Sequence, residues 1–127
     1  MARLALLGFV CAVALAAQAG AHHSYAMYDM QAERMIEGRV ERVDWVNPHV
    51  LIVLRASEAG QSGTWRIEGH APVRFEGNGF RRGTLKAGDQ AQVVFHPLRE
   101  GSGGSLVSLT LSDGRTFDRF GAPALSE

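Results

Sequence analysis

The stretch from Ile36 to Leu54, IEGRVERVDWVNPHVLIVL, decides the fold class. Its first part alternates apolar and polar residues, and the apolar positions change parity between Val40 and Val43. We expect a long strand with a bulge or bend near Glu41-Arg42, because one extra residue shifts the inward-facing positions. After Asn47-Pro48, an unbroken apolar run predicts a second strand buried on much of both faces.

Shorter elements follow on the C-terminal side. Trp65 and Ile67 alternate with polar neighbours and predict a third strand, after a turn at residues 61–63. Pro72 suits the first position of a short helix within residues 71–80. The remaining chain predicts turns and strands in alternation: a turn at 85–89, a strand with Ala91, Val93 and Phe95 on one face, a glycine-rich turn at 100–104, a strand with Val107, Leu109 and Leu111 on one face, a turn at Asp113-Gly114 and a last strand at Thr116-Phe117.

This order of elements predicts an all-β fold with one short helix, in the form of a small five-stranded OB-like barrel. A bent, glycine-containing first strand fits that barrel, because it must serve both of its halves. An open β-meander or a small sandwich would explain the same periodicity. We expect the barrel over residues 35–120, an N-terminal arm at 22–34 and a frayed C-terminal tail at 121–127.

The N-terminus has the layout of a cleavable secretory signal peptide over residues 1–21. Arg3 is followed by the apolar run Leu4–Ala17 and then by small residues. The run is shorter than the roughly 20 residues that a membrane-spanning helix needs, so we expect export without a retained anchor. Cleavage is allowed after Ala21, which we favour, or after Ala19.

Removal of this leader leaves a single domain's worth of chain. It also removes Cys11, the one cysteine, so the mature protein can form no disulfide and must rely on a packed core or a bound ligand. The chain has 13 basic and 13 acidic residues, and loss of Arg3 leaves one net negative charge. Nucleic acid and anionic lipid therefore have no electrostatic support as partners.

The processed N-terminus is a candidate copper site. Cleavage after Ala21 would give His22 a free α-amine beside its own imidazole, and a second imidazole would complete the three-nitrogen set called a histidine brace. Such tetragonal nitrogen sites suit Cu(II), and both types of nitrogen can deprotonate for a metal near neutral pH. Cleavage after Ala19 would instead give Gly20-Ala21-His22, which can wrap Cu(II) or Ni(II) in a square plane. The alternative is that a histidine near the cleavage site is incidental.

The second imidazole of a brace could come from His49, His96 or His23. His49 follows Asn47-Pro48 at the start of the second strand, and His96 closes the fourth strand, so both stand at strand ends that can converge on one rim. A structural hydrogen-bonding role explains either histidine equally well. His70 follows a glycine in a loop, and we expect it to be solvated.

Two methionines near the mature N-terminus, Met27 and Met30, carry thioether sulfur, a soft donor that favours Cu(I). We favour the simpler interpretation, in which they and Tyr25 and Tyr28 pack an N-terminal arm against the barrel. Asp29 could orient a ligand imidazole or serve as an ordinary turn residue.

No motif in the sequence points to an enzyme reaction by itself. Trp45 and Trp65 could form an aromatic platform for a carbohydrate, but both fall on core positions of their strands, and we favour core packing. The sequence has no nucleophile elbow, catalytic cysteine pattern, phosphate loop or paired zinc-ligand motif. We therefore expect a metal-binding protein first, a metal-free binding or adaptor module second and a copper enzyme third.

Several segments together resemble a family of small exported bacterial proteins classified as a domain of unknown function, whose members open with His-His-Ser and carry a Trp-x-Asn-Pro-His segment. The segments are His22–Asp29, Gly38–Val40, Trp45–His49, Trp65–Gly69, Leu85–Asp89 and His96–Gly101. The resemblance implies a periplasmic β protein and supplies no activity. It favours His22, His23, His49 and His96 as one metal-binding set, and it gives no support to a role for His70.

Overall fold

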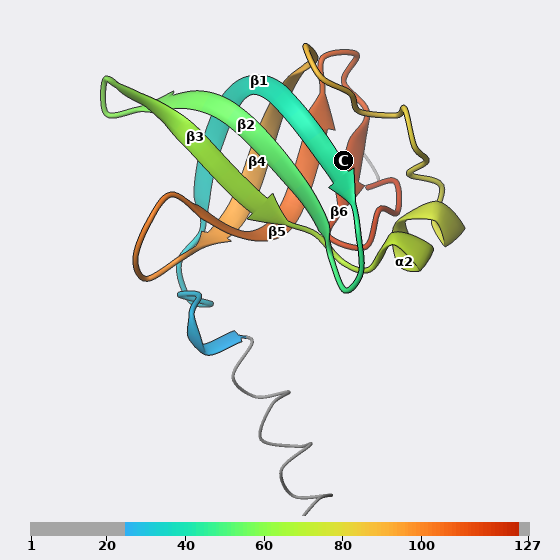
Figure 1. Ribbon diagram of the computed structural model, residues 1–127, viewed down its shortest axis with the longest axis horizontal. Helices are drawn as coiled ribbons and strands as arrows, with labels where there is room; N and C mark the ends of the chain where they lie inside the picture. Colours follow the sequence, from blue (N-terminus) through green and yellow to red (C-terminus); the bar gives the residue numbers. More distant parts are fainter. Residues whose placement is uncertain (1–24, 125–127) are drawn as a thin grey trace, which may run out of the picture.

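The strands of this chain form one sheet that closes on itself (Figure 1). The computed structural model describes residues 25–124. Its elements are β1 (Arg34–Trp45), β2 (Val50–Glu58), β3 (Gln61–Glu68), α2 (Pro72–Gly77), β4 (Gln90–Pro97), β5 (Gly103–Leu111) and β6 (Thr116–Asp118). The predicted all-β fold with one short helix is confirmed.

The order of strands is β3-β2-β1-β4-β5-β6, and a parallel pairing of β3 with β5 closes the barrel. Residues 66–68 of β3 face residues 103–105 of β5 in this closing pair. β1 serves both halves, because its first part pairs with β4 and its second part with β2. The closed ring contains β1 to β5, and β6 is added beside β5. The five-stranded OB-like barrel is therefore confirmed, and an open meander or a sandwich is excluded by the closure.

The bend in β1 lies where the change of parity predicts it. The register with β2 shifts between Val40 and Arg42, so Glu41 is the extra residue of the bulge. Gly38 stands just before this point, and a Cβ there would lie 2.5 Å from the carbonyl oxygen of Arg55. The strand can bend around the barrel because this glycine lets β1 and β2 approach closely.

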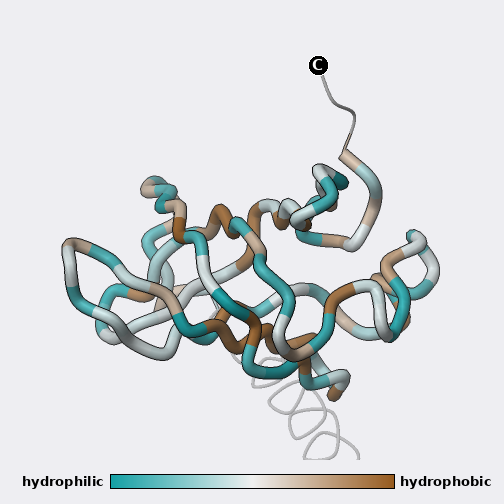
Figure 2. The backbone as a smooth tube through the Cα atoms, turned by 90° about the horizontal axis from the view of Figure 1, so that it is seen from above, coloured by the Kyte–Doolittle hydropathy of each residue, from teal (hydrophilic) through white to brown (hydrophobic). Residues whose placement is uncertain are grey.

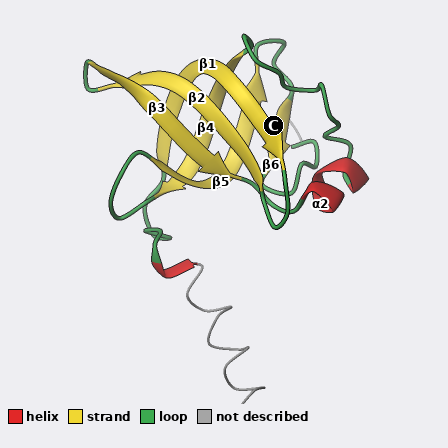
Figure 3. Cartoon of the chain, viewed as in Figure 1, coloured by secondary structure: helices red, strands yellow, loops and turns green. Residues whose placement is uncertain are grey.

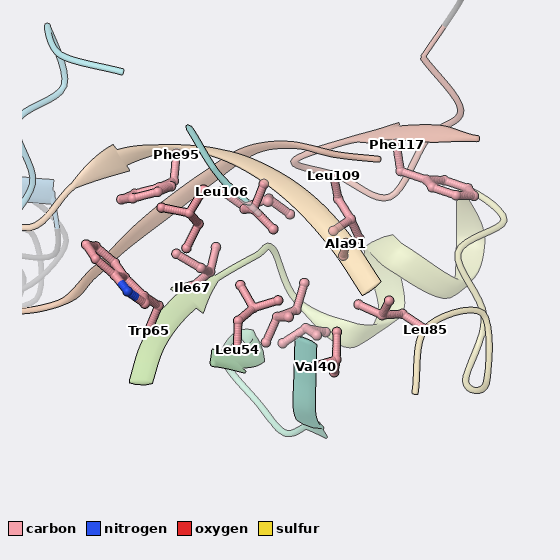
Figure 4. Close-up of a cluster of buried hydrophobic side chains, with 14 of the residues drawn as sticks. Val40, Leu54, Trp65, Ile67, Leu85, Ala91, Phe95, Leu106, Leu109 and Phe117 are labelled. Carbon is pink, nitrogen blue, oxygen red and sulfur yellow. The ribbon is translucent and has the colours of Figure 1, made fainter. Parts of the chain in front are cut away.

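The inside of the barrel is filled by aliphatic and aromatic side chains from every strand (Figure 4). Trp65 is 6% exposed and packs on Phe95 at 5.7 Å between ring centroids, while Trp45 is partly buried against the same core. Both tryptophans therefore pack in or against the core, as predicted. Hydrophobic and hydrophilic segments alternate along the tube in Figure 2, as expected for strands with one face inside.

One end of the barrel is covered by α2 and by the chain that follows it. The Phe75 and Phe80 rings are fully buried at 5.3 Å from each other, and the ring of Phe117 meets that of Phe80 at 4.9 Å. Residues 121–124, predicted to fray, instead dock here: Gly121 packs against Phe75. Pro123 forms a bridge with Phe117, so backbone hydrogen bonds hold this segment to β6.

Two element boundaries differ from the prediction. Residues 61–63 belong to β3 rather than to a turn, because the chain reverses at Ala59 and Gly60, which both have positive φ. On β5, Leu106 rather than Val107 faces the core, because a bulge shifts the register with β4 at this point. Alternation alone does not reveal where an extra residue is inserted.

The close approach of β5 to β4 depends on Gly104. A Cβ at this position would overlap the backbone carbonyl of His96 and the ring of Phe95. We expect Gly104→Ala to lower the free energy of unfolding by about 1–3 kcal/mol, measured by chemical denaturation. Gly63→Ala is the matched control in β3, where a Cβ would meet no atom within 4 Å. Equal stability of the two variants would contradict a close contact of β5 with β4 at Gly104.

Candidate functional site

The N-terminal arm is anchored to the barrel by backbone pairing beside the end of β4. Tyr28 forms a bridge with Leu98, and the N–H of Asp29 donates to the carbonyl of Pro97 at 2.8 Å. The Tyr28 side chain is 5% exposed, so the prediction that it packs the arm against the barrel is confirmed. Figure 3 shows the arm and the loop between β1 and β2 on the same side of the barrel.

The prediction that Tyr25, Met27 and Met30 also pack against the barrel is wrong. Tyr25, Met27 and Met30 are exposed, because the single buried position of this short segment is taken by Tyr28. The side chain of Asp29 accepts a hydrogen bond from the N–H of Gln31 at 3.2 Å. Asp29 is thus a turn residue.

Tyr28 reaches across the sheet to a carboxylate at the end of β3. Its hydroxyl donates to Oε2 of Glu68 at 2.7 Å, and Nδ1 of His49 lies 3.6 Å from the same oxygen. Burial raises the pKa of Tyr28 well above its ordinary value, and the hydrogen bond to Glu68 adds to the shift. The phenol therefore stays protonated at physiological pH and remains a donor to Glu68.

These residues line a pocket of about 310 Å³, which we call the His49 pocket. Its walls include His49, Glu68, His70 and Ser105, with Tyr25 and Tyr28 from the arm and Arg119 and Phe120 from the segment after β6. The pocket is large enough for a small ligand. Two histidines and a carboxylate from two separate segments, the loop before β2 and the end of β3, therefore line one pocket where the arm enters the fold.

His70 is not the solvated residue that its loop position predicts. It is half-buried, and its ring lies 5.2 Å from that of Phe120. Its Nδ1 accepts a hydrogen bond from the N–H of Ala71 at 2.8 Å, so the ring proton resides on Nε2 in the neutral form. Burial lowers the pKa of His70, and the charge of Arg74 lowers it further. His70 is thus a neutral donor without a free ring lone pair.

In His96 the two ring nitrogens have the opposite roles from those in His70. Nδ1 of His96 lies 2.9 Å from the carbonyl oxygen of Ala32, which can only accept, so in the neutral ring Nδ1 carries the proton and Nε2 has the free lone pair. A backbone carbonyl that holds one ring nitrogen in this way is a frequent support for a metal-ligating histidine. His96 is not among the residues that line the His49 pocket, so the fold does not bring His49 and His96 into one pocket.

Within residues 25–124, no three His, Cys, Asp or Glu side chains are grouped so that they could hold a metal ion. The predicted ligands His22 and His23, the leader and both cleavage points lie outside the described residues. A brace would therefore need its first two nitrogens from that part of the chain. No helix in the described part of the chain is both long and apolar enough to cross a membrane.

The sequence did not indicate Glu68, Tyr28 or Arg119 as neighbours in one pocket. Glu68 occupies a polar position next to Ile67 on β3, which marks an outward side chain but not its partner. Arg119 follows β6, and its guanidinium lies 4.8 Å from the centre of the Phe120 ring. The three residues are far apart along the chain, and only the closed barrel places them together.

The fold and the site define a small OB-like barrel with a polar pocket beside its N-terminal arm. The chain belongs to the family of unknown function DUF6152, whose sequence model matches residues 10–107. This confirms the resemblance to a domain-of-unknown-function family. No curated protein and no solved structure matches the chain.

Proposed function

We propose that the processed protein is periplasmic and binds a copper ion, with nitrogen ligands from the mature N-terminus and from His49. The supporting observation is that Tyr25 lines the same pocket as His49. His22 precedes Tyr25 by three residues, and three residues of extended chain span at most about 11 Å. The chain between His22 and Tyr25 is therefore long enough to bring the α-amine and the imidazole of His22 to this pocket.

The surroundings of His49 favour a metal ligand. With its proton on Nδ1, the ring would face the Glu68 carboxylate and present the lone pair of Nε2, and Tyr28 holds that carboxylate in place. A carboxylate that supports a ligating histidine fixes the ring and raises its basicity as a ligand. Its negative charge also attracts a cation. His70 cannot take the same role without losing its hydrogen bond from Ala71.

The site of cleavage decides the chemistry of the terminus. Cleavage after Ala21 produces the brace, in which His49 supplies the third nitrogen. Cleavage after Ala19 produces a terminus that surrounds Cu(II) with nitrogens of its own, with no need for His49. Mass spectrometry of the exported protein distinguishes the two starts.

The test is a Cu(II) titration at neutral pH of the processed protein, His49→Ala and His70→Ala. We expect one tight site in the wild type, a loss of affinity of at least roughly 10- to 100-fold in His49→Ala, since even a supporting residue costs that much, and unchanged affinity in His70→Ala. The two histidines line one pocket, so the pair controls for general damage to it. Equal affinity of all three proteins would refute His49 as a ligand.

The His49 pocket also supports a second candidate, a binding module that uses no metal. The Arg119 guanidinium and the Phe120 and Tyr25 rings offer one cation and two aromatic walls to a small molecule or a partner side chain. Under this function Arg119→Ala would weaken ligand or partner binding, and copper would not be retained by the purified protein. The His49→Ala titration separates the two functions.

A further inference from the structure

The described chain leaves six large hydrophobic side chains exposed, and three of them are methionines within nine residues. Met27 is 51% exposed, Met30 is 37% exposed and Met35 is 61% exposed. Methionine is usually found inside proteins, because its apolar side chain gains from burial. The three thioethers contribute little to the core, and no packing role explains their exposure.

The backbone of this segment, at Ala32, makes a hydrogen bond with the side chain of His96 on β4. The carbonyl of Ala32, between Met30 and Met35, accepts a hydrogen bond from Nδ1–H of His96, which leaves the lone pair of the neutral ring on Nε2. The imidazole is therefore oriented by the same stretch of backbone that carries the methionines. It lies outside the His49 pocket.

The register places Met35 next to this histidine. Met35 on β1 pairs with Val94 on β4, and His96 lies two residues further along β4. Both side chains occupy outward positions of their strands. Diagonal neighbours of this kind have Cβ atoms up to about 7–8 Å apart, a gap that long side chains such as methionine can bridge.

Met30 belongs to the segment that pairs with the end of β4. It lies in the turn that the hydrogen bond from Ala32 N–H to the Asp29 carbonyl closes at 3.2 Å. The N–H of Asp29 in turn donates to Pro97, the residue after His96. Met27 lies further along, where its carbonyl accepts from the N–H of Arg99. The turn that carries Met30 thus lies beside Pro97, the neighbour of His96, and Met27 is more distant along the arm.

We propose that Nε2 of His96 and the sulfur atoms of Met30 and Met35 form a surface site for Cu(I). Thioether sulfur is a soft donor that selects Cu(I), and imidazole also binds copper well. Neutral sulfur ligands hold harder divalent ions weakly, so the site discriminates by oxidation state. It goes beyond the proposed function, because it uses none of the residues of the His49 pocket.

The experiment is a competition for Cu(I) against the chromophoric chelator bicinchoninate, under anaerobic conditions with ascorbate. The protein is the processed chain carrying Lys86→Arg, with its α-amine acetylated so that the N-terminal nitrogens are blocked. Lys86 is the only lysine of the chain, so acetylation then modifies the α-amine alone. We expect competition for Cu(I), and X-ray absorption should show sulfur among the ligands.

In that background, Met30→Leu combined with Met35→Leu should lower Cu(I) affinity by at least roughly 10- to 100-fold, as losses around a metal site do. Leucine keeps the volume and the apolar character, so folding should be preserved. Met27→Leu and His49→Ala are the controls, and both should bind Cu(I) as before. Unchanged affinity in the double variant, or an equal loss in either control, would overturn the site. A failure of Cu(II) binding at the N-terminus would leave this result unaffected.

Discussion

Acetylating the α-amine of the processed protein is expected to abolish its tight Cu(II) site. A brace takes two of its three nitrogens from the first residue, and an acetylated nitrogen becomes an amide whose lone pair is no longer available. One imidazole from His22 and one from His49 would remain, without the chelate ring that the amine closes. The measurement is a Cu(II) titration at neutral pH, before and after acetylation, in the Lys86→Arg background.

The control for this experiment is Lys86→Arg without acetylation, which should bind Cu(II) like the wild type. Lys86 forms a surface ion pair with Asp89, with 3.4 Å between nitrogen and oxygen, and arginine can maintain that pair. Arg119→Ala serves as a second control, because it changes the pocket but removes no proposed ligand. Full Cu(II) affinity after acetylation would exclude the N-terminal amine as a ligand, whichever cleavage site is used.

Phe75→Ala is expected to lower the free energy of unfolding by about 3–5 kcal/mol, the range for deletion of a buried phenylalanine ring. The ring is fully buried between Trp45 and Phe80, with 6.1 Å and 5.3 Å between ring centroids. Gly69 lies against it so closely that a Cβ there would be 2.5 Å from Cζ of Phe75. Removal of the ring would leave a cavity between Trp45, Phe80 and Gly69.

Val73→Ala is the control for that change, because Val73 lies in the same helix and is 73% exposed. We expect Val73→Ala to alter the unfolding free energy by less than about 0.5 kcal/mol. Chemical denaturation of both variants measures the difference. A small loss in Phe75→Ala would mean that α2 is not part of the cooperative core.

Local patterns predicted much of the barrel. The change of parity between Val40 and Val43 located the bulge of β1, because an inserted residue must reverse which positions face inward. Proline at the first position located α2. Docking of residues 121–124 could not be predicted in this way, because a short segment rich in small residues has no periodicity of its own and is held by contacts with Phe75 and β6.

The candidate site was only partly predictable. The strand-end position of His49 follows from Asn47-Pro48. Its distance from Glu68 depends on the β2–β3 hairpin. The contact of Glu68 with Tyr28 depends on an arm that lies forty residues earlier in the chain. The loop position of His70 predicts a solvated side chain, but a loop position gives no information about the Phe120 ring that packs beside it. The exposure of Met27 and Met30 was likewise hidden, since a short arm has room for one buried side chain and the sequence does not show which residue takes it.

The sequence by itself determined the class of fold and the family, because the alternation of apolar residues is a local property that each strand carries with it. It also determined which groups could bind a metal, since imidazole and thioether chemistry belongs to the residue. Only the tertiary structure decided which of these groups lie in one pocket. It places His49 in a pocket with Glu68 and Tyr28, and His96 does not line that pocket. The physical reason is that such meetings are set by the register and closure of the barrel, which depend on contacts between residues far apart in the chain.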